Sequence, residues 1–150
     1  MVSGCSRMAF AQIMIGMEEA DKNVYEWFLN TDNKITKSLQ ISSRLYNDIV
    51  TNEDEDRRGF STAWTCYMKQ HNVSRNEAVK AFREKLAAAW KVINEGYCMR
   101  PTPVPRAILR AALNYQRMLD FAYKYNDDYT KPEIAFKHLI PKVLLHPIPI

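Results

Sequence analysis

Apolar residues recur along most of this chain at the three- and four-residue spacing of amphipathic helices. Sustained apolar–polar alternation and Asn-Gly or Asp-Gly turns are missing from the sequence, so strands are not predicted. The pattern predicts helices over residues 7–16, 22–29, 34–56, 62–70, 75–95, 107–125 and 132–145. Because the connections between them are short, we expect an all-α bundle of about six or seven helices.

Polar residues, glycine and proline mark the predicted helix boundaries. Residues 31–33, Thr-Asp-Asn, separate two helices and offer an N-cap for the longer one. Gly59 provides a C-terminal break, and Ser74 with Glu77 has the spacing of a capping box. Three prolines within residues 101–105 predict a stiff connection.

Composition limits the class of protein. The chain has 150 residues, 47% hydrophobic and 25% charged, which suits one domain with a sizeable core. The net charge is +4, but Lys and Arg are interleaved with acids, so a nucleic-acid partner is not expected. No run of 18 apolar residues and no leader-like apolar segment is found, so we expect neither a membrane span nor a signal peptide.

The cysteines are Cys5, Cys66 and Cys98, spaced singly and odd in number. This spacing argues against a zinc site and against a disulfide framework. We expect small, buried, reduced thiols, which is the usual state of cysteine in the cytosol.

The chemistry of the chain is concentrated at Asn47, Thr51 and Glu55, which recur at i, i+4 and i+8. On a helix these side chains form one stripe, about 12 Å long between the end Cα atoms. An amide oxygen, a hydroxyl and a carboxylate suit a hard divalent cation such as Mg²⁺. Arg44 lies three residues earlier on roughly the same face and could bind a phosphate in a bidentate manner.

A simpler interpretation is that the polar residues only form a solvated helix face, and we assign Glu53, Asp54 and Asp56 to it. For the stripe itself, the apolar neighbours favour a partly buried cavity instead. These neighbours are Leu45, Tyr46, Ile49 and Val50.

Residues 44–55, followed by Arg57-Arg58-Gly59, resemble the second metal motif of plant class I terpene synthases, Asn/Asp-Asp-x-x-Ser/Thr-x-x-x-Glu. The resemblance extends over essentially the whole chain and is closest to the sesquiterpene synthases. Further family landmarks follow in order: Cys66-Tyr67-Met68-Lys69, Ala89-Trp90-Lys91 with Ile93-Asn94-Glu95, the proline segment 100–105, Tyr129-Thr130 and the ending 147–150.

The resemblance implies a role for each matching position. Asn47, Thr51 and Glu55 would hold Mg²⁺, or Mn²⁺ in its place, against a prenyl diphosphate, and Arg44 would donate hydrogen bonds to that diphosphate. The other implied positions are Ser3-Gly4 at a helix break and the pocket residues Tyr123, Asp127 and Tyr129. Because aromatic faces stabilise a carbocation, Trp27 and Tyr46 are further candidates, although a core role is favoured for Trp27.

By the same resemblance the chain is the C-terminal portion of a catalytic domain, residues 1–150. The full-length parent would be a monomeric, Mg²⁺-dependent lyase that ionises and cyclises a prenyl diphosphate, expected to be farnesyl diphosphate, to a sesquiterpene. The family's Asp-Asp-x-x-Asp motif and Arg-x-Arg segment are not found in this sequence, so we expect no turnover by these residues alone. Two alternatives stay open: a non-catalytic truncated or degenerate helical product, and a small helical interaction module unrelated to terpenes.

Overall fold

The fold is known from a computed structural model, which describes residues 6–59, 62–128, 130–133 and 136–145, without the side chains of residues 52–56 and 143. All regular structure in these ranges is helical, as predicted. The elements are α1 (Ser6–Met14), α2 (Lys22–Leu29), α3 (Lys34–Arg57), α4 (Ala63–His71), α5 (Arg75–Cys98), α6 (Arg106–Ala122), the 3₁₀ helix η1 (Phe136–His138) and α7 (Ile140–Leu144).

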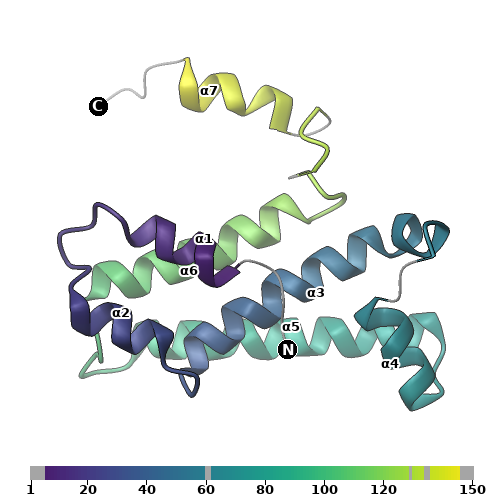
Figure 1. Ribbon diagram of the computed structural model, residues 1–150, viewed down its shortest axis with the longest axis horizontal. Coiled ribbons are helices and arrows are strands. Elements are labelled where there is room, and N and C mark those ends of the chain that lie inside the picture. Colours follow the sequence, from purple (N-terminus) through teal and green to yellow (C-terminus); the bar gives the residue numbers. More distant parts are fainter. Residues whose placement is uncertain (1–5, 60–61, 129, 134–135, 146–150) are drawn as a thin grey trace.

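Two 24-residue helices, α3 and α5, lie side by side and form the largest helix–helix contact of the fold. Helix α6 packs on both of them, and α1 packs on α3 and α6, so α3 lies in the middle of the bundle. Helix α4 contacts α3 and α5 at one end of the pair, whereas α7 stands apart from the bundle, above α1 and α6 in the view of Figure 1. No helix in the described ranges is long and apolar enough to cross a membrane.

The apolar faces of these helices meet in two clusters of buried side chains. The larger cluster joins α1, α2, α3, α5 and α6 around Phe10 and Phe28, whose ring centroids are 5.1 Å apart. The smaller one joins α3, α4 and α5. Its buried members are Leu45, Trp64, Ala78, Phe82 and Leu86. Burial of each large apolar side chain stabilises the fold by about 1.5–3 kcal/mol. Because α3 contributes to both clusters, apolar contacts stabilise it on both sides.

Three predicted helix boundaries, the two ends of α3 and the start of α5, are confirmed. Helix α5 runs three residues past its predicted end, to Cys98, and α1 ends at Met14, two residues before its predicted end. The Asn33 side chain accepts hydrogen bonds from the backbone N–H groups of Ile35 and Thr36 and thereby begins α3. Ser74 and Glu77 form the predicted capping box of α5. Gly59 adopts a φ of 74°, the left-handed conformation that glycine allows just beyond a helix end.

The predicted helix over residues 132–145 is wrong. Its described residues contain only η1 and the five-residue α7. Pro141 has no N–H to donate and would clash with the carbonyl four residues earlier, so it is tolerated only in the first turn of a helix, where the structure places it. Helix α6 also ends three residues earlier than predicted, with Tyr123 as its C-cap.

The prediction that the cysteines are buried is wrong for Cys66 and Cys98, which are exposed. Cys66 lies two positions after the buried Trp64 on α4, and residues two apart do not share a helix face. Cys5 lies outside the described residues.

Candidate metal and anion site

The stripe on α3 opens into a polar pocket of about 280 Å³. Asn47 and Thr51 are half-buried and line it, with Val50 between them. Glu55 lies one turn further along α3, but its side chain falls outside the described set. Two members of the predicted stripe therefore share one pocket.

The opposite wall comes from the loop after α6, a segment far from α3 in the sequence. Its lining residues are Asn126, Asp127, Thr130 and Lys131, and Arg58 completes the pocket at the end of α3. The structure thus brings Asp127, a predicted pocket residue, to Asn47 and Thr51.

The oxygen atoms of the stripe suit a hard cation. The Thr51 hydroxyl donates its proton to the backbone carbonyl of Asn47, at 2.9 Å. Its lone pairs are therefore directed away from that carbonyl and can serve a cation together with the Asn47 amide oxygen. Among the described residues no three His, Cys, Asp or Glu side chains gather as a metal site.

Arg44, the predicted diphosphate ligand, is held by a carboxylate of its own helix. Its Nε donates to Asp48 Oδ2 at 2.9 Å, and its Nη2 contacts Asp48 Oδ1 in an ion pair. Asp48 is fully buried, whereas the Arg44 side chain is 31% exposed. The bidentate contact fixes the guanidinium plane. Arg44 is not among the residues that line the polar pocket.

Asp127 organises the loop that faces the stripe. Its two carboxylate oxygens accept hydrogen bonds from the backbone N–H and the hydroxyl of Thr130, at 3.0 and 2.6 Å. The backbone carbonyl of Asp127 also accepts from the N–H of Lys131 at 2.9 Å. These contacts close a tight turn and fix the direction in which it faces α3.

The remaining predicted site residues are more scattered. Tyr123 lines a neighbouring pocket of about 360 Å³ together with Tyr46, and this pocket shares Val50 with the polar one. Trp27 lines a separate pocket beside the α2–α3 connection. Tyr129 and Ser3-Gly4 lie outside the described residues.

A hydrogen-bonded chain crosses the neighbouring pocket. Trp90 Nε1 donates to the Tyr46 hydroxyl at 3.1 Å, and that hydroxyl donates to Asp120 Oδ1 at 2.8 Å. The three residues belong to α5, α3 and α6, so one hydroxyl ties together the helices that position the site. Burial raises the pKa of Tyr46 to about 12, and the Asp120 carboxylate adds to this while the Trp90 hydrogen bond opposes it.

This pKa predicts a loss of stability at alkaline pH. The unfolded chain releases the Tyr46 proton near pH 10, whereas the folded chain keeps it until about pH 12. The contribution of this raised pKa to the free energy of unfolding is therefore complete below about pH 10 and falls between about pH 10 and 12. Urea unfolding at about pH 9 and pH 11 should show a smaller alkaline loss for Tyr46→Phe than for wild type. Tyr125→Phe, at a site that is 77% exposed, should behave as wild type, and equal losses in all three proteins would contradict the prediction.

Comparison with known proteins decides the family. The family described as "Terpene synthase family, metal binding domain" matches residues 1–92, more than half of the chain. The chain belongs to the terpene synthase family. The match includes Arg44 and the whole stripe, so the family's metal-binding domain covers the α3 wall of the polar pocket.

Plant terpene synthases are similar to the chain over most of its length. It is 35% identical to beta-cubebene synthase of Magnolia grandiflora over 152 residues, covering 100% of this chain and 27% of that protein. It is 45% identical to terpene synthase 1 of Citrus sinensis over 118 residues, covering 77% of the chain and 21% of the relative. Germacrene-A synthase of Humulus lupulus is 37% identical over 145 residues, covering 95% of this chain and 25% of that protein. The chain thus spans about a quarter of the length of these terpene synthases.

Sequence analysis missed several residues of the site. The Arg44–Asp48 pair has the i, i+4 spacing of helix ion pairs, which was a usable signal. No signal in the sequence identified Asp120 as the partner of Tyr46, because 74 residues separate them. Arg58 and Lys131 likewise come together only in the folded chain.

Proposed function

We propose that this terpene synthase chain carries part of the site at which a prenyl diphosphate lyase binds Mg²⁺ and the diphosphate of its substrate. The observation that supports it best is the shared pocket of Asn47, Thr51 and Asp127. Asn47, Thr51 and Glu55 would hold Mg²⁺, which when bound neutralises charge on the diphosphate as it leaves. The full-length parent would convert farnesyl diphosphate to a sesquiterpene.

The residues of this chain act by binding and orienting. Arg44 donates from Nη1 to a diphosphate oxygen, because Asp48 holds the other edge of its guanidinium. Asp127 keeps the facing turn closed through Thr130. Tyr123 and Tyr129 are proposed to contribute to the wall of the hydrocarbon pocket, where aromatic faces favour a cation.

Binding of inorganic pyrophosphate tests the proposal, measured by isothermal titration calorimetry with and without Mg²⁺. We expect Mg²⁺ to raise the affinity at least about tenfold, and the double variant Asn47→Ala/Thr51→Ala to lose this gain. Asn94→Ala, which alters an exposed amide on α5 away from the pocket, is the control and should keep it. A gain that persists in the double variant, or no gain in wild type, would refute the proposal.

A turnover assay tests separately whether the 150 residues, which carry only part of the site, are active by themselves. The stripe supplies one carboxylate, Glu55, and the Asp-Asp-x-x-Asp motif is not in this sequence, so we expect no terpene from the 150 residues alone. The purified chain is incubated with farnesyl diphosphate and Mg²⁺, and hydrocarbons are extracted and separated by gas chromatography. A clear terpene product would overturn this expectation. The alternative, a non-catalytic helical product, predicts neither turnover nor Mg²⁺-dependent pyrophosphate binding.

A further inference from the structure

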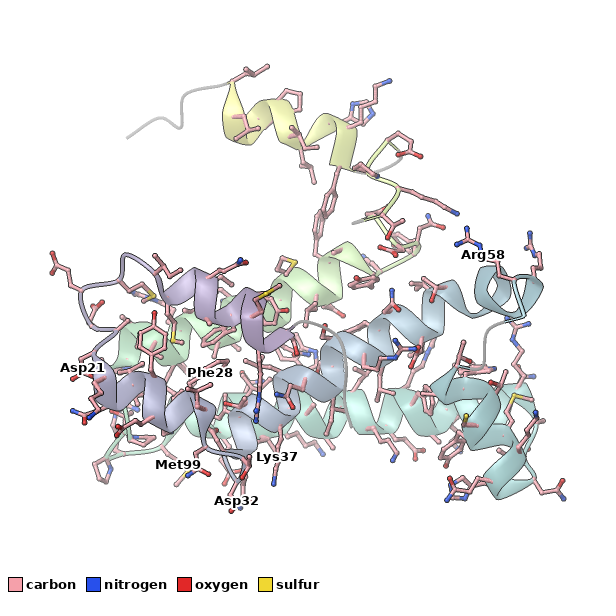
Figure 2. All side chains as sticks on the ribbon, in the orientation of Figure 1. Asp21, Phe28, Asp32, Lys37, Arg58 and Met99 are labelled. Atoms are coloured by element: carbon pink, nitrogen blue, oxygen red, sulfur yellow. The ribbon has the colours of Figure 1, made fainter. Side chains whose placement is uncertain are left out.

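Two side chains in the interior of the bundle carry polar atoms that have no partner. Gln116 on α6 and Ser42 on α3 are both 0% exposed, and in the described part of the chain neither the Gln116 amide nor the Ser42 hydroxyl makes a hydrogen bond. At the start of α3, by contrast, Asp32 and Lys37 pair at the surface, at the lower edge of the view in Figure 2. Buried polar groups in folded proteins are nearly always satisfied by protein or by ordered water, so Gln116 and Ser42 need a partner.

The two side chains belong to the same stretch of the contact between α3 and α6. The Tyr46 hydroxyl donates to Asp120 Oδ1 at 2.8 Å, which fixes how α3 is aligned with α6. Ser42 precedes Tyr46 by four residues on α3, and the two helices run in the same direction (Figure 1). Gln116 precedes Asp120 by the same step on α6. Because residues four apart share a helix face, Ser42 and Gln116 come together one turn before that hydrogen bond.

A third unpartnered group belongs to α1. Arg7 Nε is also buried and makes no hydrogen bond within the described residues. Phe10, three residues later on α1, meets the ring of Tyr115 with centroids 6.0 Å apart, and Tyr115 is the neighbour of Gln116. Helix α1 contacts both α3 and α6. The three groups therefore come from three helices that pack on one another.

The donors and acceptors of these groups suit water. The Gln116 amide offers two N–H donors and an oxygen acceptor, and Arg7 Nε offers a further donor. The Ser42 hydroxyl can donate or accept, because it does not donate to a backbone carbonyl as the Thr51 hydroxyl does. A buried water molecule typically makes about three hydrogen bonds, both as donor and as acceptor. An apolar occupant would leave every one of these groups unsatisfied.

We propose that α1, α3 and α6 enclose a binding site for an ordered water molecule, held by the Gln116 amide and the Ser42 hydroxyl, with Arg7 Nε at its edge. The water bridges α3 to α6 one turn before the Tyr46 hydrogen bond, so polar contacts join these helices over two successive turns. The site is independent of the proposed function, because none of its three side chains lines the polar pocket.

Urea unfolding of the 150-residue chain tests whether the buried amide has a partner. Gln116→Leu keeps the approximate size of the side chain and removes its polar atoms. We expect it to lower the urea midpoint by roughly 0.5 M, and Ser42→Ala to lower it as well, because each loses hydrogen bonds to the water. The double variant Ser42→Ala/Gln116→Leu should lose less than the sum of the two losses, since both variants lose the same water. Gln70→Leu, at an exposed position of α4, is the matched control and should keep the wild-type midpoint.

Nuclear magnetic resonance on the wild-type chain identifies the occupant, and this measurement stands even if a variant fails to fold. The side-chain amide protons of Gln116 should show a nuclear Overhauser cross-peak to water, with the sign of a long-lived contact. A higher midpoint for Gln116→Leu, or additive losses in the double variant, overturns the site, because the amide would then be unpaired or bonded elsewhere. Non-additive losses without the water cross-peak also overturn it, because Ser42 and Gln116 would then bond to each other directly.

Discussion

Replacing Arg44 with alanine is expected to lower the free energy of unfolding by about 4 kcal/mol, because the variant leaves a fully buried Asp48 carboxylate without its guanidinium. The opposite replacement, Asp48→Ala, should cost less, about 2 kcal/mol. Arg44 is 31% exposed and can turn toward water when its partner is lost. Urea unfolding followed by circular dichroism at neutral pH measures both values.

The double variant Arg44→Ala/Asp48→Ala completes the cycle and removes the buried carboxylate as well. It should be more stable than Arg44→Ala alone, so the coupling energy exceeds about 1 kcal/mol. Arg110→Ala, at an exposed position of α6, serves as the control and should change stability by less than about 0.5 kcal/mol. If Arg44→Ala and Asp48→Ala each lowered the free energy of unfolding by the same small amount, the ion pair would not stabilise this part of the fold.

Trp64→Ala should also cost about 4 kcal/mol, because it empties the centre of the smaller cluster. Trp64 is 1% exposed and meets Phe82 edge to face, with ring centroids 5.4 Å apart and an interplanar angle of 83°. Its loss removes apolar contact between α4 and the α3–α5 pair and leaves a cavity that rigid helices cannot close. The midpoint and slope of urea unfolding give the measured value.

Trp64→Phe is the matched variant for this position. It keeps an aromatic ring against Phe82 and should cost about half as much as Trp64→Ala. Trp27→Ala, at a half-buried site on α2 outside the smaller cluster, should leave the contact between α4 and α5 intact. If Trp64→Ala lost less than about 1 kcal/mol, α4 would not depend on this cluster.

The helices of the bundle were largely predictable because local signals agreed with each other. The bounds of α2 match the prediction residue for residue, and those of α3 within one residue. In α5 an apolar stripe and the Ser74–Glu77 capping box point to the same start. The error at residues 132–145 came from weighing apolar spacing above Pro141, whose missing N–H confines it to a first turn.

The candidate site was likewise predictable only in part. The amino-acid sequence alone determined that Asn47, Thr51 and Glu55 share a helix face, since that follows from 3.6 residues per turn, and that Arg44 lies beside them. Only tertiary structure decided that the loop of Asp127 closes over this face while Tyr123 lines the next pocket. Periodicity acts within one helix, whereas the meeting of α3 with a loop some 80 residues later depends on how α3, α5 and α6 bury their apolar faces together.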